Sequence, residues 1–353
     1  MIVTHYTGFD VHKKSVSYCV KTAAGEVVEE ARLAADHETL RRWAGAQRKP
    51  WHGAMEATIF SAWIYDTLKP HAEQLYMAHP ARMKAICSGK KKSDRIDART
   101  IADLLRCNLL PACYVLPPPM RDLRRLLRYR NLVVRESVRM QNKMAGLLME
   151  TGTPFEKEKL HGKKYFTNLL KTLQEVPESV KDLLRMSRGA LEMFQATQKQ
   201  LVKRLVGDSL LVQRVERLTT VQGVGEITAL TWALEIGDPQ RFSSNGDAMS
   251  YCGLTAALRS SAGKEQRGPI SKQRNAWLQT ALIEAAKLAP RWNPQLAAVQ
   301  ARELDRGHHN RATLAVARKL VAYLLAVDKS GLPFQARPLP PAGEALGTAA
   351  ASG

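Results

Sequence analysis

Short runs of apolar and β-branched residues near the N-terminus follow the pattern of β-strands. Residues 2–10, 15–21 and 25–33 predict three successive strands. Two more runs, one ending at Glu56 and one covering residues 74–77, predict a fourth and a fifth strand.

Helical periodicity follows the third, fourth and fifth of these runs. It covers residues 36–47 and 61–68 and a segment that begins at Asp94. The resulting order, β-β-β-α-β-α-β-α, is that of the ribonuclease-H-like fold, an α/β architecture in which the first acid lies on the central strand. We therefore expect an α/β domain over residues 1–116.

The middle of the chain is helical in pattern. Three prolines at 117–119 are expected to stop helical structure. After them, residues 120–150 and 177–206 predict long amphipathic helices. We expect these helices to form an antiparallel linker arm over residues 117–207 that pairs with another subunit.

Residues 208–330 are helical in pattern throughout, which predicts an all-α C-terminal domain. Gly223 and Gly225 form a G-x-G turn between two helical segments, a helix-hairpin-helix pattern whose N–H groups can hold a phosphate. The alternative is a plain connection between helices. Residues 331–353 are rich in Pro, Ala and Gly, lack periodicity and are expected to be disordered.

The formal net charge of +20 indicates a polyanionic partner. Residues 82–106 hold eight Lys and Arg against three acids, and residues 121–150 repeat that ratio. No apolar stretch reaches the ~20 residues of a membrane span, and the N-terminus lacks a signal-peptide pattern. We therefore expect a cytoplasmic, nucleoid-associated protein without a membrane partner. Five scattered cysteines exclude a disulfide framework and a zinc knuckle.

Four carboxylates stand at positions suited to metal ions. Asp10 ends the first strand, Glu56 ends the fourth, and Asp94 and Asp97 lie on one face of a helix at spacing i, i+3. Carboxylates crowded together repel each other unless a cation neutralises them. Two Mg²⁺ ions about 4 Å apart, or Mn²⁺ in their place, fit such a set for phosphoryl transfer. Singly, each acid could instead end a strand, pair with a lysine or cap a helix.

A basic loop at residues 253–275 contains Ser260 and Ser261. Serines in loops are usually ordinary turn residues. Here the surrounding cations would also suit a serine nucleophile that attacks a phosphate held by guanidinium groups, and spacing alone does not decide between the two. The candidate nucleic-acid contacts are Lys91, Lys92, Arg95, Gly223, Gly225, Arg259, Lys264, Arg267, Lys272 and Arg274.

Together these motifs resemble the DEDD transposases of the insertion-sequence-110 family, which are relatives of the Piv-type DNA invertases. The resemblance covers roughly residues 3–330 and implies a RuvC-like nuclease domain, a helical linker and a C-terminal transposase domain. The matching residues are Gly8-Phe-Asp-Val-His-Lys13, Glu56-Ala-Thr58, Lys92-Ser-Asp-Arg-Ile-Asp-Ala98, Gly223-Val-Gly225, Glu235-Ile-Gly-Asp238, Arg241-Phe242, Gly253-Leu254 and Ile270-Ser-Lys272.

The resemblance implies Mg²⁺-dependent transposition in which the four acids named above bind metal and a serine becomes linked to DNA. The family serine falls on Ser261. Ala262 replaces the glycine that usually follows it, which leaves Ser260 as a competitor, and Arg274 replaces the glycine usual before Asn275. In similar proteins a structured noncoding bridge RNA selects donor and target DNA within a tetramer. We therefore expect DNA, a guide RNA and a dimeric or tetrameric homo-oligomer as partners.

Three functions compete at this point. The first is an RNA-guided DNA transposase or recombinase with a covalent serine intermediate. The second is a RuvC-like, structure-selective DNA nuclease without that intermediate, and the third is a domesticated, non-catalytic nucleic-acid-binding protein. The complete set of acids argues against the third function, and the serine-bearing domain argues against the second.

Overall fold

The computed structural model describes residues 5–86, 94–261 and 264–336, with the backbone alone at 94–96, 257–261 and 264–267. The chain divides into two compact units, Met1–Pro118 (unit 1) and Pro119–Gly353 (unit 2). Each unit has its own hydrophobic core, as the separate core clusters of the two units indicate. Across the described ranges, every helix is too short or too polar to cross a membrane.

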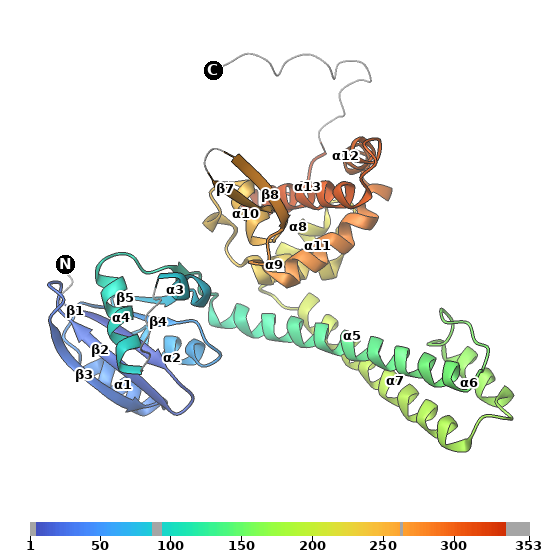
Figure 1. The fold of residues 1–353 in the computed structure, drawn as a ribbon, viewed down its shortest axis with the longest axis horizontal. Coiled ribbons are helices and arrows are strands. Elements are labelled where there is room, and N and C mark those ends of the chain that lie inside the picture. The colour runs from blue at the N-terminus through green and yellow to red at the C-terminus, as the bar shows by residue number, and fades with distance from the viewer. Residues whose placement is uncertain (1–4, 87–93, 262–263, 337–353) are drawn as a thin grey trace, which may run out of the picture. The chain divides into compact units, whose positions relative to one another are not determined.

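Unit 1 is built on a mixed sheet whose described strands lie in the order β3-β2-β1-β4-β5-β6 (Figure 1). The central strand β1 pairs antiparallel with β2 and parallel with β4, which in turn pairs parallel with β5. The five predicted strands are confirmed, and the short β6 is an addition. The bounds are β1 His5–Val11, β2 Ser15–Lys21, β3 Val27–Ala34, β4 Trp51–Glu56, β5 Gln74–Ala78 and β6 Ala112–Cys113.

Helices cover both faces of this sheet. On one face α1 inserts Trp43 among Phe9, Tyr18 and Trp51, at ring-centroid distances of 5.3, 4.8 and 5.7 Å. These aromatic rings form much of the core of unit 1 because each buries a large apolar area. The helix bounds are α1 His37–Ala46, α2 Ser61–Leu68, α3 Pro80–Ile86 and α4 Asp94–Arg106.

On the other face α4 approaches β1 very closely. A Cβ atom at Gly8 would lie 2.1 Å from the carbonyl O of Ala98 and 2.5 Å from the N of Ala102. Only glycine permits this separation. Two ion pairs hold α4 over the neighbouring strands. Arg99 Nε and Nη2 donate to Glu30 Oε1 and Oε2 at 2.9 and 2.7 Å, and Lys21 Nζ lies 2.5 Å from Asp103 Oδ2.

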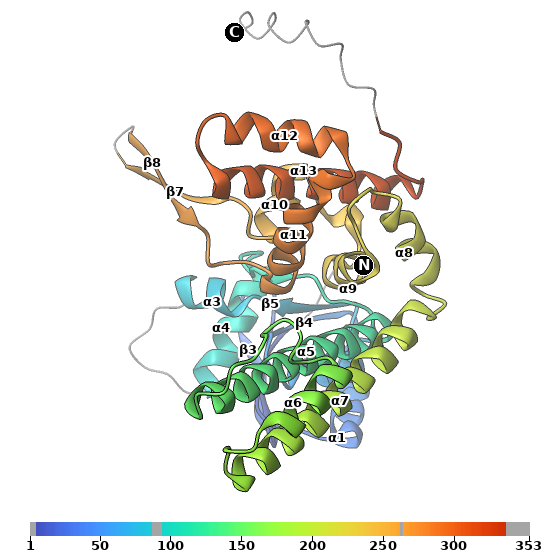
Figure 2. The same ribbon diagram turned by 90° about the vertical axis from the view of Figure 1, so that its right-hand side faces the viewer.

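Unit 2 begins with an antiparallel helical arm, in which α5 and α7 run side by side and α6 lies at their far end (Figures 1 and 2). Apolar residues of all three helices form its core, including Met144 of α5, Phe166 of α6 and Leu184 of α7. The bounds are α5 Pro118–Glu150, α6 Lys163–Thr172 and α7 Glu178–Val206. The prediction that the prolines at 117–119 stop helical structure is wrong, since Pro118 and Pro119 form the start of α5. Proline is accepted there because the N–H groups of a first helical turn have no acceptor within the helix.

The rest of unit 2 is a helical body around the buried helix α9, and the N-terminal half of α5 joins its core through Leu123 and Leu127. The chain stays attached beyond α13, since the N of Phe334 donates to Thr220 Oγ1 at 2.7 Å. The helix bounds are α8 Val212–Thr219, α9 Glu226–Ile236, α10 Asn245–Tyr251, α11 Ala276–Leu288, α12 Pro294–Leu304 and α13 His309–Ser330.

The prediction of an all-helical C-terminal domain is wrong at one place. Strands β7 (Ala256–Ser261) and β8 (Lys264–Ile270) form an antiparallel hairpin that projects from the helices (Figure 2). Ser260 and Ser261 therefore lie in a strand and not in a loop. These strands carry mostly polar residues without the alternation that identifies a strand, so their pairing and not their composition defines them.

The close approach of α4 to β1 predicts a strong effect of Gly8→Ala. The added methyl group would overlap the α4 backbone, and we expect a loss of about 1–3 kcal/mol in the free energy of unfolding. Urea denaturation followed by tryptophan fluorescence measures it. The matched control is Gly45→Ala within α1, where a Cβ would meet nothing within 4 Å, and which should stabilise by about 0.5 kcal/mol. Equal stability of the two variants would contradict the packing.

Candidate active site

Asp10 and Glu56 lie on the sheet face that α4 covers. Phe9 and Met55 pair across the parallel strands β1 and β4, and both belong to the core on the α1 side. Successive side chains of a strand point to opposite faces. The next residues, Asp10 and Glu56, therefore both point to the other side, at the carboxyl ends of neighbouring strands.

Helix α4 brings Asp97 to the same face. Asp97 directly precedes Ala98, whose carbonyl group packs against Gly8, two residues before Asp10. Asp94 is the first residue of α4, and its side chain lies outside the described part. The fold thus places all four predicted acids on three adjoining elements, β1, β4 and α4.

The oxygen atoms of these carboxylates are ligands that a hard cation such as Mg²⁺ prefers. The described residues nevertheless do not form a complete set of ligands. Glu56 and Asp97 are partly buried, and neither carboxylate forms an ion pair or hydrogen bond with another described residue. Partly buried carboxylates without partners favour a bound cation. In the described residues, however, no three His, Cys, Asp or Glu side chains lie close enough together to hold a metal ion.

His12 contacts the candidate site and has no role in the sequence prediction. Its Nε2 lies 3.0 Å from Oδ2 of Asp10, whose side chain is 18% exposed. The only signal for this contact in the sequence is the position of His12, two residues after Asp10 and just beyond β1. Such a neighbour can orient a carboxylate through a hydrogen bond.

Asp103 is excluded as a further metal ligand because cations of the protein already neutralise it. Its carboxylate lies 2.5 Å from Lys21 Nζ and 2.8 Å from Arg106 Nε. Burial alone would raise the pKa of Asp103, but the hydrogen bonds from Lys21 and Arg106 outweigh burial and lower it. Asp103 therefore stays ionised and acts in holding α4 to β2.

The β7–β8 hairpin carries the candidate nucleophile. Its register pairs Ser261 with Lys264 and Ser260 with Glu265. The side chains of both serines, and those of Arg259, Lys264 and Arg267, lie outside the described part. The two serines thus have different cross-strand neighbours, one basic and one acidic.

The other predicted nucleic-acid contacts have mixed surroundings. Lys272 and Arg274 are exposed just after β8. Arg274 also has a structural contact, since its Nη1 donates to the carbonyl O of Ser271 at 3.3 Å. Lys91 and Lys92 lie outside the described residues, as does the side chain of Arg95.

The G-x-G turn joins α8 to α9, as the helix-hairpin-helix pattern predicts. Gly223 has φ +92°, and a Cβ there would lie 2.4 Å from the Cβ of Ala289, so this position requires glycine. Gly225 is the N-cap of α9 and has open space around it. A groove of about 490 Å³ borders the turn, with Glu284 and Trp292 among its lining residues. The backbone suits phosphate contact, which stays a prediction.

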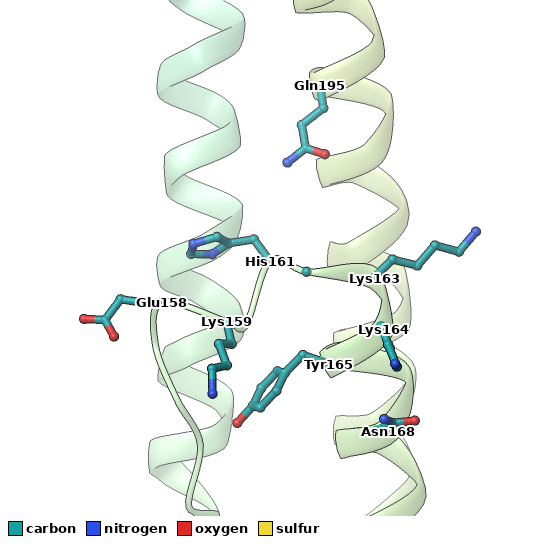
Figure 3. A pocket seen from close by; sticks show the side chains of 9 residues that line it. Glu158, Lys159, His161, Lys163, Lys164, Tyr165, Asn168 and Gln195 are labelled. Atoms are coloured by element: carbon teal, nitrogen blue, oxygen red, sulfur yellow. The ribbon is translucent and has the colours of Figure 1, made fainter.

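A larger pocket of about 690 Å³ lies at the tip of the arm in unit 2. Lysines 159, 163 and 164 line it, but their side chains point in different directions (Figure 3). Lys159 is also paired with Glu156, with Nζ 2.7 Å from Oε2. The pocket therefore lacks the converging groups of a catalytic site.

Two families of known sequences match separate parts of this chain. A family described as a transposase of the DEDD IS110 type matches residues 7–153, and the "Transposase IS116/IS110/IS902 family" matches residues 215–300. The two matches together include β1, β4 and α4 of unit 1 and the β7–β8 hairpin of unit 2.

Two curated relatives extend over most of the chain. The transposase for insertion sequence element IS1328 of Yersinia enterocolitica is 28% identical over 298 residues, which is 80% of this chain and 84% of the relative. A probable family 20 transposase of Pseudomonas aeruginosa is 26% identical over 254 residues, 69% of this chain and 73% of the relative. The chain belongs to the IS110 family of insertion-sequence transposases, enzymes that recombine DNA by phosphoryl transfer.

Proposed function

We propose that this transposase is a Mg²⁺-dependent enzyme in which Ser261 forms a covalent link to DNA, guided by a structured noncoding RNA. The observation that carries the proposal is the common face of Asp10 and Glu56, at the ends of adjacent parallel strands beneath the helix that bears Asp94 and Asp97. Acids carried by three adjoining elements, two of them at the carboxyl ends of neighbouring strands, would suit metal-dependent phosphoryl transfer.

Asp10, Glu56, Asp94 and Asp97 would hold the metal ions, two Mg²⁺ with Mn²⁺ as an alternative. Bound Mg²⁺ supplies positive charge that stabilises the phosphate oxygens as negative charge develops on them. His12 would orient Asp10 through its hydrogen bond to Oδ2. The carboxylates of Glu56 and Asp97, which have no partner within the described residues, are available as ligands.

Ser261 would act as the nucleophile on a DNA phosphate. Its Oγ–P bond forms as a P–O bond of the DNA strand breaks; the serine proton passes to solvent, and the leaving oxygen takes up a proton. A hydroxyl group of another strand then displaces Ser261 and restores a phosphodiester. The register favours Ser261 over Ser260, because Lys264 opposite Ser261 would attract a phosphate whereas Glu265 opposite Ser260 would repel it.

Nucleic acids and a second copy of the chain would be the partners. The net charge of +20 supports contact with donor DNA, target DNA and a guide RNA. Apolar side chains stay exposed along the arm, among them Tyr129 at 56% and Met186 at 71%, which supports pairing of arms in a dimer or tetramer. Such an enzyme would work at the bacterial nucleoid.

Asp97→Asn should abolish the Mg²⁺-dependent reaction while leaving DNA binding intact. Loss of a metal ligand is expected to slow strand transfer at least about 100-fold, whereas binding depends on the basic surface. The control is Asp103→Asn on the same helix, whose partners are Lys21 and Arg106. It should lower stability but keep the Mg²⁺ dependence of strand transfer. Equal activity of Asp97→Asn and the wild type would remove Asp97 from the site.

Ser261→Ala should eliminate the covalent protein–DNA adduct, whereas Ser260→Ala should retain it. The two residues are neighbours in β7, so the pair controls for damage to the strand. Mass spectrometry of a trapped, protease-digested complex identifies the modified serine. An adduct on Ser260 would reassign the nucleophile. Strand cleavage by Ser261→Ala at the wild-type rate would instead indicate a hydrolytic nuclease.

A further inference from the structure

A buried carboxylate in unit 2 joins three elements at one point. Glu235 of α9 has a fully buried side chain. Arg128 of α5 binds both of its oxygens, Nε to Oε1 at 2.7 Å and Nη2 to Oε2 at 2.8 Å, and Asn275 Nδ2 donates to Oε2 at 2.9 Å. A buried carboxylate is costly to leave unpaired, so these bonds fix the relative positions of α5, α9 and Asn275.

Asn275 extends this contact to the exit of the hairpin. Its Oδ1 accepts from the N of Trp277 and of Leu278 at 3.1 and 3.2 Å, which caps α11, and its own N donates to the carbonyl O of Tyr251 at 3.0 Å. Three residues separate it from Ser271, whose N donates to the carbonyl O of Thr255 at the hairpin base. The segment that follows β8 therefore ends at a residue whose polar groups are all engaged.

The entry to the hairpin is held as firmly. Gly253 has φ +71°, and a Cβ there would lie 2.4 Å from the Cβ of Arg274, so the two ends of the hairpin are in contact. Gln279 Nε2 donates to the carbonyl O of Gly253 at 2.6 Å, and Arg318 Nε donates to that of Leu254 at 2.8 Å. These two hydrogen bonds fix the base of the hairpin to α11 and α13.

Helix α5 makes a second contact with the start of α11. The guanidinium carbons of Arg128 and Arg135 lie 6.0 and 5.3 Å from the ring centroid of Trp277, within the range of cation–π attraction. Arg128 thus touches both Glu235 and Trp277. The same helix, 33 residues and about 50 Å long, continues into the arm.

We infer that Arg128, Glu235 and Asn275 are positioning residues that couple the arm helix α5 to the hairpin bearing Ser261. This inference rests on the proposed role of Ser261. A change in the tilt of α5 displaces Arg128, and through Glu235 and Asn275 it displaces the base from which β7 and β8 project. The three residues act through the hairpin and not on the phosphate: they set the place from which the serine attacks it.

Unit 2 contains a second buried arginine–carboxylate pair that can serve as a control for Arg128 and Glu235. Arg214 of α8 binds Asp328 of α13 in the same two-bond manner, both at 2.7 Å, and Trp232 Nε1 adds a third bond at 2.9 Å. The Asp328 side chain is 4% exposed. This pair joins two helices of the body and involves neither α5 nor Asn275, although Arg214 Nη2 also donates to the carbonyl O of Gly237 at 2.7 Å. It therefore reports the cost of losing a two-bond pair away from the contact between α5 and Asn275.

The test compares Arg128→Lys with Arg214→Lys in the full-length protein. Lysine keeps the charge but cannot bind both carboxylate oxygens in this geometry. Both variants should lower the midpoint of thermal unfolding to a similar extent. Only Arg128→Lys should speed hydrogen exchange of the amides at 255–272, by about tenfold or more. It should also slow formation of the Ser261–DNA adduct at saturating DNA about tenfold, with the Kd for DNA changed less than about twofold.

Exchanging the amide of Asn275 and the carboxylate of Glu235 provides a rescue experiment. Asn275→Asp keeps the cap of α11 but places a second carboxylate beside Glu235, and it should reproduce the effects of Arg128→Lys. Adding Glu235→Gln restores one amide and one carboxylate at this contact and should recover a measurable part of the adduct rate.

Two results would overturn the inference: unchanged hydrogen exchange at 255–272 in Arg128→Lys, or an equal slowing of the adduct in Arg214→Lys. If the wild type forms no adduct at all, the proposed role of Ser261 is wrong. The exchange comparison between the two lysine variants still decides whether Arg128 fixes the hairpin, so the two failures are distinguishable.

Discussion

The close contact between α4 and the central strand β1 governs the arrangement of unit 1. Because Gly8 leaves no side chain between them, the helix backbone lies directly on the strand, two residues from Asp10. The pairs Arg99–Glu30 and Lys21–Asp103 then fix the helix over β3 and β2. These contacts fix both the position and the rotation of α4. They therefore determine how the acids of α4 face Asp10 of β1 and Glu56 of β4.

Much of unit 1 follows from local patterns in the sequence, because its strands are runs of apolar and β-branched residues, and two of the candidate acids stand where such a run ends. Asp10 and Glu56 could be placed on this basis. The β7–β8 hairpin could not, since Arg259 to Ser261 and Lys264 to Arg267 have no apolar alternation and become strands only through mutual pairing. The bond between Arg128 and Glu235 spans 107 positions, a distance at which no local pattern indicates a partner.

Both units use the same kind of connection between elements that are far apart in sequence. Arg99–Glu30, Arg128–Glu235 and Arg214–Asp328 each place two guanidinium nitrogens on the two oxygens of one carboxylate. In a chain with a net charge of +20, many cations have no acid of the protein to neutralise them and can meet phosphate groups. These three arginines instead bind carboxylates of the protein, so their role is internal.

A ribbon of two strands, such as β7–β8, has too little hydrogen bonding and packing to be rigid along its length in water. Its base is anchored by Gln279 and Arg318. On the proposal that Ser261 attacks DNA, contact between this ribbon and a nucleic acid would order the strand that carries the nucleophile, and it would cost part of the substrate affinity. A nucleic acid that does not contact the ribbon would then not complete the catalyst.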